Sequence, residues 1–233
     1  MGYGQRLRVQ RTADVRVLKS QLDLIADVAR SARFVSPLWA VWVAFVTSAA
    51  VGYFGHHSFA VAATLPVLIG AIAMVGFRLS DVYRRDTFSH TDSNRLQPWF
   101  TKFIAYQIAI SSAWGLMPWL LWEPGNALNH VFLAGAVICA LAWLVIRCAS
   151  HMDMFLAAVV PVVALASLRF VFGGFWIDMI TAVVLPAFAA QLFFDGRRLT
   201  YRLDEDSRLR FEVEDFAREL EEARAEALRK RFE

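Results

Sequence analysis

Six long apolar segments constrain this chain more than any other feature of its sequence. The hydrocarbon core of a bilayer is about 30 Å thick, so a helix needs about 20 apolar residues to cross it. Segments near this length occupy residues 38–55, 58–77, 100–122, 131–146, 155–172 and 176–194. We therefore predict an all-α membrane protein built as a six-transmembrane helix bundle.

The composition and the distribution of charge agree with this prediction. Hydrophobic residues make up 58% of the chain, compared with about 45–50% in soluble domains. The basic residues flank the apolar segments and do not gather with aromatic residues on one soluble face, so a nucleic-acid partner is not expected. The chain has only two cysteines, which excludes a disulfide framework and a four-cysteine zinc site.

The orientation follows from the connecting segments. Lys and Arg are absent from residues 56–57, 123–130 and 173–175, whereas the N-terminal segment, the second loop and the tail are rich in them. Because positively charged loops remain in the cytoplasm, both termini are expected there, in a bacterial inner membrane. The outer loops are too short to hold a periplasmic domain, so any stimulus is expected to act on the membrane part or from inside the cell.

The two ends of the chain have a different pattern from the middle. Residues 1–36 carry apolar side chains at helical spacing between basic ones, which predicts a cytoplasmic amphipathic helix. This helix is expected to lie on the inner leaflet or to pack against the tail. We therefore divide the chain into this helix, a transmembrane sensor domain at residues 37–195 and a cytoplasmic signalling coiled coil at residues 196–233.

The tail has a heptad pattern. The apolar positions alternate at spacings of four and three residues, and extrapolation towards the N-terminus adds one polar position; the seam is Asp206, Leu209, Val213, Phe216 and Leu220. Such a seam is typical of a two-stranded coiled coil, in which a polar core residue fixes the register. We therefore expect a homodimer. The alternative is a single amphipathic helix that packs on another surface.

Four residues of the third apolar segment are candidate ligand-binding residues: Tyr106, Gln107, Ser111 and Trp114. Polar side chains are costly in hydrocarbon unless they face the interior of a bundle. Gln107, Ser111 and Trp114 share one helix face because of their spacing. The same pattern also fits hydrogen bonds that only hold the helices together.

Further candidates lie near the predicted outer face. Arg169 and Asp178 stand on either side of a short hairpin and are expected to form an ion pair that clamps it. His56, His57 and His130 can meet at this face to bind a metal or respond to pH, or they are ordinary interfacial histidines. No catalytic motif is present, and neither a cofactor nor a metal is predicted.

The tail also carries a family resemblance. The run Phe193-Phe194-Asp195-Gly196-Arg197-Arg198, followed by the Glu- and Arg-rich stretch 208–233, resembles the N-terminal sensor region of bacterial membrane histidine kinases and diguanylate cyclases. In such proteins the helix continues into a phosphoacceptor helix or a GGDEF domain, and neither motif occurs here. The resemblance thus implies a sensor region without its output domain, which would be a kinase or cyclase acting with a response regulator. The run Ala225–Lys230 favours the kinase.

The sequence therefore predicts a dimeric membrane sensor whose last two spans pass a shift or rotation to the coiled coil. Two alternatives remain. One is a small transporter or channel, to which the mid-membrane prolines Pro66, Pro161 and Pro186 are also suited. The other is a scaffold that binds a cytoplasmic partner through residues 199–233.

Overall fold

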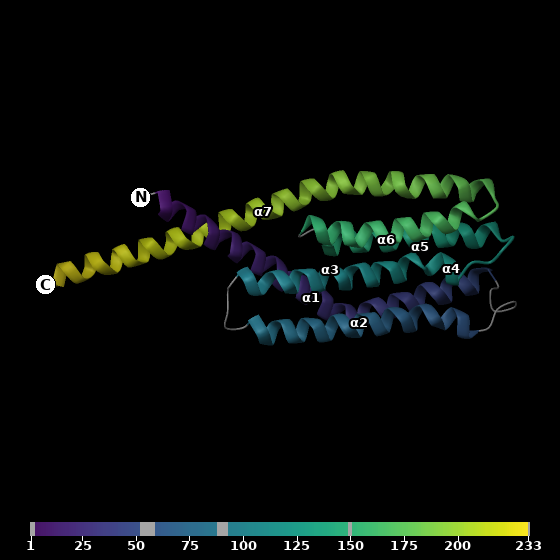
Figure 1. Cartoon of the computed structure of the whole chain (residues 1–233), viewed down its shortest axis with the longest axis horizontal. Coiled ribbons are helices and arrows are strands. Elements are labelled where there is room, and N and C mark those ends of the chain that lie inside the picture. Colours follow the sequence, from purple (N-terminus) through teal and green to yellow (C-terminus); the bar gives the residue numbers. More distant parts are fainter. Residues whose placement is uncertain (1–2, 52–58, 88–92, 149–150, 233) are drawn as a thin grey trace.

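The computed structural model describes residues 3–51, 59–87, 93–148 and 151–232, and these residues form helices and short connections without a strand. The helices are α1 (Tyr3–Val51), α2 (Phe59–Thr87), α3 (Ser93–Gly115), α4 (Met117–Leu120), α5 (Ala127–Cys148), α6 (Met152–Val171) and α7 (Trp176–Phe232). The predicted all-α class is confirmed. Figure 1 shows most helices side by side in one bundle, with α7 and the N-terminal part of α1 extending beyond it at the same end.

Four of the described helices are long and apolar enough to cross a membrane: Ala63–Thr87, Ala127–Leu144, Met152–Val171 and Trp176–Arg198. They coincide with the second, fourth, fifth and sixth predicted segments. The first predicted segment lies at the end of α1, and its last residues fall outside the described part of the chain. The membrane character of the protein thus rests on these four helices.

The third predicted segment, residues 100–122, is not one helix. α3 ends at Gly115, and a short helix, α4, follows from Met117 to Leu120. Pro118 lies at the start of α4. A proline has no backbone N–H and clashes with the carbonyl group four residues earlier, so it can break the helix that precedes it, as at Pro118, or remain inside a continuing helix, as Pro37 does in α1. The amide groups of Trp119 and Leu120 instead both donate to the carbonyl oxygen of Leu116, at 3.0 and 3.1 Å.

The predicted N-terminal amphipathic helix and the first apolar segment form a single helix in the structure. α1 is 49 residues long and continues through Pro37. Small side chains on one of its faces, including Ala26, Ala29 and Ala32, are buried, and small residues let two helices approach closely. The hydroxyl of Ser80 on α2 donates to the carbonyl oxygen of Ala26 at 2.7 Å. This part of α1 therefore packs against α2.

Two further polar contacts join α1 to the end of α2. The Tyr83 hydroxyl donates to Asp23 Oδ1 at 2.9 Å, and Arg84 forms an ion pair with Asp27. The ring of Tyr83 is fully buried and meets Trp99 and Phe103 of α3 edge-on, with ring centroids 5.6 Å apart in each pair. Edge-to-face pairs of this kind are favourable beyond the area that they bury. Tyr83 thus connects three helices at this end of the bundle.

Close contact between α3 and α6 leads to a first prediction. A Cβ atom added at Gly115 would lie 3.0 Å from Leu165 Cβ, Pro161 O and Val162 Cα. Two of these atoms belong to the backbone and cannot turn away. We expect Gly115→Ala to lower the free energy of unfolding by about 1–3 kcal/mol, the usual cost of overpacking. Unfolding of the purified protein in detergent, followed by circular dichroism, measures this change.

The matched control is Gly135→Ala on α5, where nothing lies within 4 Å of the added Cβ. Alanine is a better helix former than glycine by about 1 kcal/mol, so this variant should be unchanged or slightly more stable. Equal stability of the two variants would contradict the close packing of α3 on α6.

Candidate functional site

The four predicted ligand-binding residues of α3 are all buried in the bundle. Gln107 Nε2 donates to Ser111 Oγ at 2.9 Å, one helical turn away. The ring of Tyr106 lies against Gly76 of α2 and leaves no room for a Cβ atom at that glycine. These residues therefore contribute to helix packing, which was one of the two functions considered for them.

Three of the four residues also line a cavity, which we call the α3 cavity. It lies between α1, α3, α5 and α6 and has a volume of about 30 Å³; its walls include Ser36, Tyr106, Gln107, Trp114, Trp143 and Cys148. Ser111 is not among the lining residues. A cavity of this size holds about two water-sized groups. The sequence pattern identified the α3 wall but not the α1 and α5 walls, because spacing along one helix says nothing about its neighbours.

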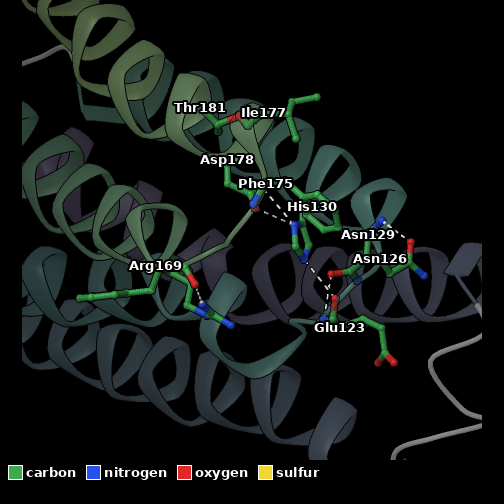
Figure 2. A network of polar contacts seen from close by, with 10 residues as sticks. Glu123, Asn126, Asn129, His130, Arg169, Phe175, Ile177, Asp178 and Thr181 are labelled. Carbon is green, nitrogen blue, oxygen red and sulfur yellow. Dashed lines mark hydrogen bonds and ion pairs between the residues drawn. The ribbon is translucent and has the colours of Figure 1, made fainter.

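A second polar site lies where α5 and α7 begin (Figure 2). His130 Nδ1 is 2.9 Å from Asp178 Oδ1 and 3.0 Å from Asp178 Oδ2. Both side chains are only 1% exposed. A buried charged group is stable only when it is paired and hydrogen-bonded. This contact therefore fixes the first turn of α7 to the first turn of α5.

The second ring nitrogen of His130 also faces an oxygen atom. Nε2 lies 3.0 Å from the backbone carbonyl oxygen of Glu123. A neutral imidazole donates through only one nitrogen, whereas an imidazolium donates through both. A carbonyl oxygen is an acceptor only, as is an ionised carboxylate. Both ring nitrogens of His130 therefore lie within hydrogen-bond distance of an oxygen atom, Nδ1 at Asp178 and Nε2 at Glu123, and the ring is held from both sides.

Asp178 is held from its own helix as well. The backbone N–H of Phe175, directly before α7, donates to Asp178 Oδ2 at 3.0 Å. This is one half of a capping box, in which the third helical residue reaches back to the N-cap. A carboxylate in the first turn also interacts favourably with the helix dipole. The preceding turn contains Gly174, whose φ of 95° favours glycine.

The loop that presents the Glu123 carbonyl is ordered by Asn129. Asn129 Oδ1 accepts from the Glu123 N–H at 3.0 Å, and Asn129 Nδ2 donates to the carbonyl oxygen of Leu121 at 3.0 Å. Asn126 caps α5, since its Oδ1 accepts from the Asn129 N–H at 3.2 Å. Figure 2 shows Asn126, Asn129 and His130 gathered around the Glu123 loop. These hydrogen bonds hold the loop in the conformation that places the Glu123 carbonyl oxygen beside His130 Nε2.

Aromatic rings enclose the pair and give Arg169 a different partner from the expected one. Trp122 stacks on His130 with ring centroids 3.7 Å apart, and the Arg169 guanidinium lies 3.9 Å from the centroid of the Trp122 ring. In the described part of the chain no direct ion pair joins Arg169 to Asp178, although the Asp178 carboxylate lies close enough to act electrostatically on the Arg169 guanidinium. Arg169 therefore binds the site through a cation–π contact.

We call this arrangement the outer cluster, defined by Trp122, Glu123, His130, Arg169 and Asp178. The sequence singled out His130, but only with His56 and His57, which lie outside the described residues. The described residues contain no group of three or more His, Cys, Asp or Glu side chains placed to hold a metal ion.

The heptad seam lies on the last part of α7, far along the same helix. Its apolar residues are exposed in the single chain: Leu209 (53%), Val213 (67%), Phe216 (75%) and Leu220 (72%). Asp206 belongs to the same helix, but its side chain is outside the described part. No helix of the described chain covers these four residues.

Comparison with known proteins adds no relative: no family model, no curated protein and no solved structure matches this chain. The two polar sites and α7 are therefore the features of the molecule that bear on its function.

The buried pair leads to a second prediction. Removal of one partner leaves the other polar group buried without its hydrogen bond, which typically costs about 1–3 kcal/mol and more where that group is charged. We expect His130→Ala and Asp178→Ala each to destabilise the protein by about this amount. The double variant should cost clearly less than the sum, because its two changes affect one interaction. Unfolding titrations of the four proteins in detergent form the required cycle.

A surface pair on α2 serves as control. Asp81 accepts from Arg85 at 3.0 Å, and the Arg85 side chain is 82% exposed. Such helical pairs contribute about 0.3–0.5 kcal/mol, so Asp81→Ala should have little effect. Additive losses in the His130 and Asp178 cycle would show that the two residues do not interact.

Proposed function

We propose that this chain is the membrane input module of a bacterial signal-transduction protein, and that it passes a membrane-sensed stimulus through a dimeric coiled coil to a histidine-kinase output domain. One observation carries the proposal. α7 is a single helix of 57 residues that begins in the outer cluster and ends in the exposed heptad seam. At 1.5 Å per residue it is about 85 Å long, far more than the thickness of a membrane.

In the proposed topology, six spans cross the inner membrane with both termini in the cytoplasm. The end of α1 forms the first span, and α3 together with α4 forms the third. The outer cluster then faces the periplasm, because its loops at residues 123–130 and 173–175 contain no Lys or Arg. The N-terminal part of α1 and the tail of α7, which leave the bundle at the same end in Figure 1, then share the cytoplasmic side.

The proposed mechanism treats α7 as a rigid connection between two polar ends. The His130–Asp178 contact holds the start of α7 in one position relative to α5. A stimulus that favours a second packing of the bundle moves α7 by a small shift or rotation. Such switching needs two packings of similar energy and a stimulus that differs in its affinity for them. The rest of α7 transmits the movement because it stays helical from Trp176 to Phe232, although Pro186 removes one backbone hydrogen bond within it.

A second copy of the chain is the proposed partner of the seam. Four large apolar side chains exposed on one stripe of a charged helix are unfavourable in water. Pairing the stripes of two chains buries them in the manner of a coiled coil. A change in the register of the paired helices then changes the relative position of the two output domains.

Cysteine crosslinking in native membranes tests both parts of the proposal. In a chain without Cys139 and Cys148, Val213→Cys and Phe216→Cys should form disulfide-linked dimers. Arg218→Cys should crosslink far more slowly, since heptad spacing places residue 218 opposite the seam. In the same background, His130→Ala should change the crosslinking rate at residue 216, whereas Asp81→Ala should leave it unchanged.

Two results would refute the proposal. Equal crosslinking at residues 216 and 218 would show that the seam is no interface. Substrate flux into liposomes that contain the purified chain would identify a transporter. Crosslinking that is insensitive to His130→Ala would leave the dimer but contradict transmission through α7.

A further inference from the structure

The α3 cavity contains polar groups that the bundle itself does not use. Gln107 is only 5% exposed, and its Nε2 is bonded to Ser111. Its Oε1 has no hydrogen-bond partner in the part of the chain that the structure describes. Ser36, also 5% exposed, has no partner for its hydroxyl among the same residues. Neither atom belongs to the fully buried side-chain atoms that lack a partner in the described residues. Gln107 Oε1 and the Ser36 hydroxyl therefore keep some accessible surface, and both residues line the cavity, where a ligand can bond to them.

The walls of the cavity define the chemistry of that partner. None of the lining residues carries a formal charge, and most are aliphatic or aromatic, the aromatic ones being Tyr106, Trp114 and Trp143. A charged ligand would lose its hydration here without gaining a counter-charge. Apolar walls with a few polar groups are typical of small-molecule sites. The site therefore suits a neutral and mainly apolar ligand.

The size and position of the cavity restrict the ligand further. About 30 Å³ holds a hydroxyl group and little more than the first carbon of a chain. Trp143, one of the residues that line the cavity, is 39% exposed, so this wall of the cavity reaches the side of the bundle at α5. In the proposed topology this side faces lipid. The remainder of a chain anchored in the cavity would therefore lie in the bilayer.

We infer that the α3 cavity binds the hydroxyl end of a neutral lipid alcohol that enters from the membrane. A hydroxyl group can donate to Gln107 Oε1 and accept from the Ser36 hydroxyl, and it satisfies both groups without bringing a charge. The inference rests on the proposed function for the membrane placement of the bundle, and it assigns a chemical class to the stimulus of the sensor. α6, one wall of the cavity, leads directly into α7.

The test is photolabelling of the full chain in lipid nanodiscs with dodecan-1-ol that carries a diazirine, followed by peptide mapping. Labelling of residues 25–36, 106–114 and 143–154 should saturate and should be displaced by unlabelled dodecan-1-ol, but much less by dodecanoate. Gln107→Leu and Ser36→Ala should each weaken displacement roughly 3- to 10-fold, as expected for the loss of one hydrogen bond. The matched control is Gln191→Leu, the same change on an exposed residue of α7, which should have no effect.

Three results would overturn the inference: labelling that rises without saturation over all lipid-facing segments, equal competition by dodecanoate, or unaltered affinity of both cavity variants. Circular dichroism of each variant confirms that the helices have formed. The measurement does not involve the tail. Saturable labelling of a chain that forms no tail crosslinks would therefore support this site and contradict the proposed function.

Discussion

Every backbone N–H and C=O group of a chain in hydrocarbon must find its partner within the protein, because no water is available there. This constraint explains the all-helical fold and the places where helices stop. Pro118 removes one backbone donor, and the break that it causes between α3 and α4 is resolved by bonds to the carbonyl oxygen of Leu116. The loop that follows is completed by Asn129, whose amide bonds to the backbone of Glu123 and of Leu121.

Once the backbone is satisfied, the remaining polar side chains decide how the helices are joined. In lipid, apolar surface alone gives little preference for one helix neighbour over another. The contacts from Tyr83 to Asp23 and from His130 to Asp178 select particular helix neighbours, because each of these polar groups has few other hydrogen-bond partners within reach. They lie towards different ends of the bundle, one between α1 and α2 and the other between α5 and α7. The interior between them is mainly apolar, and the buried amide of Gln107 is an exception.

Length and hydrophobicity were sufficient to predict the all-α fold class and four helices that are long and apolar enough to cross a membrane. They failed at residues 100–122, because an apolar segment can still contain a proline that ends a helix. Residues 1–36 were also predicted to form a helix separate from the first apolar segment, whereas α1 includes both. Apolar periodicity has the same period in two consecutive helices as in one long helix, so it does not show a boundary between them.

The sites were predicted less completely, and for a different physical reason. Helical spacing grouped Gln107, Ser111 and Trp114 on one face of α3, since local geometry determines which residues share a face; Gln107 and Trp114 line the cavity, whereas Ser111 does not. His130 and Asp178 are 48 positions apart, and their contact depends on α5 lying beside α7. Arg169 appeared to be the natural partner of Asp178 by charge and proximity in sequence. A flat guanidinium can stack on a tryptophan as well as pair with a carboxylate, and the sequence alone does not distinguish these two contacts.

Because α7 is one helix from Trp176 to Phe232, an insertion or deletion of residues within it rotates the tail relative to Asp178. Each residue turns an α-helix by about 100°, so the number of residues between Asp178 and the tail sets the angle between them. An insertion of one residue would turn the tail to another face, whereas seven residues restore nearly the original direction. If α7 transmits a signal as proposed, the number of residues between Asp178 and the tail matters more than the identity of each one, because that number sets the direction in which the tail faces.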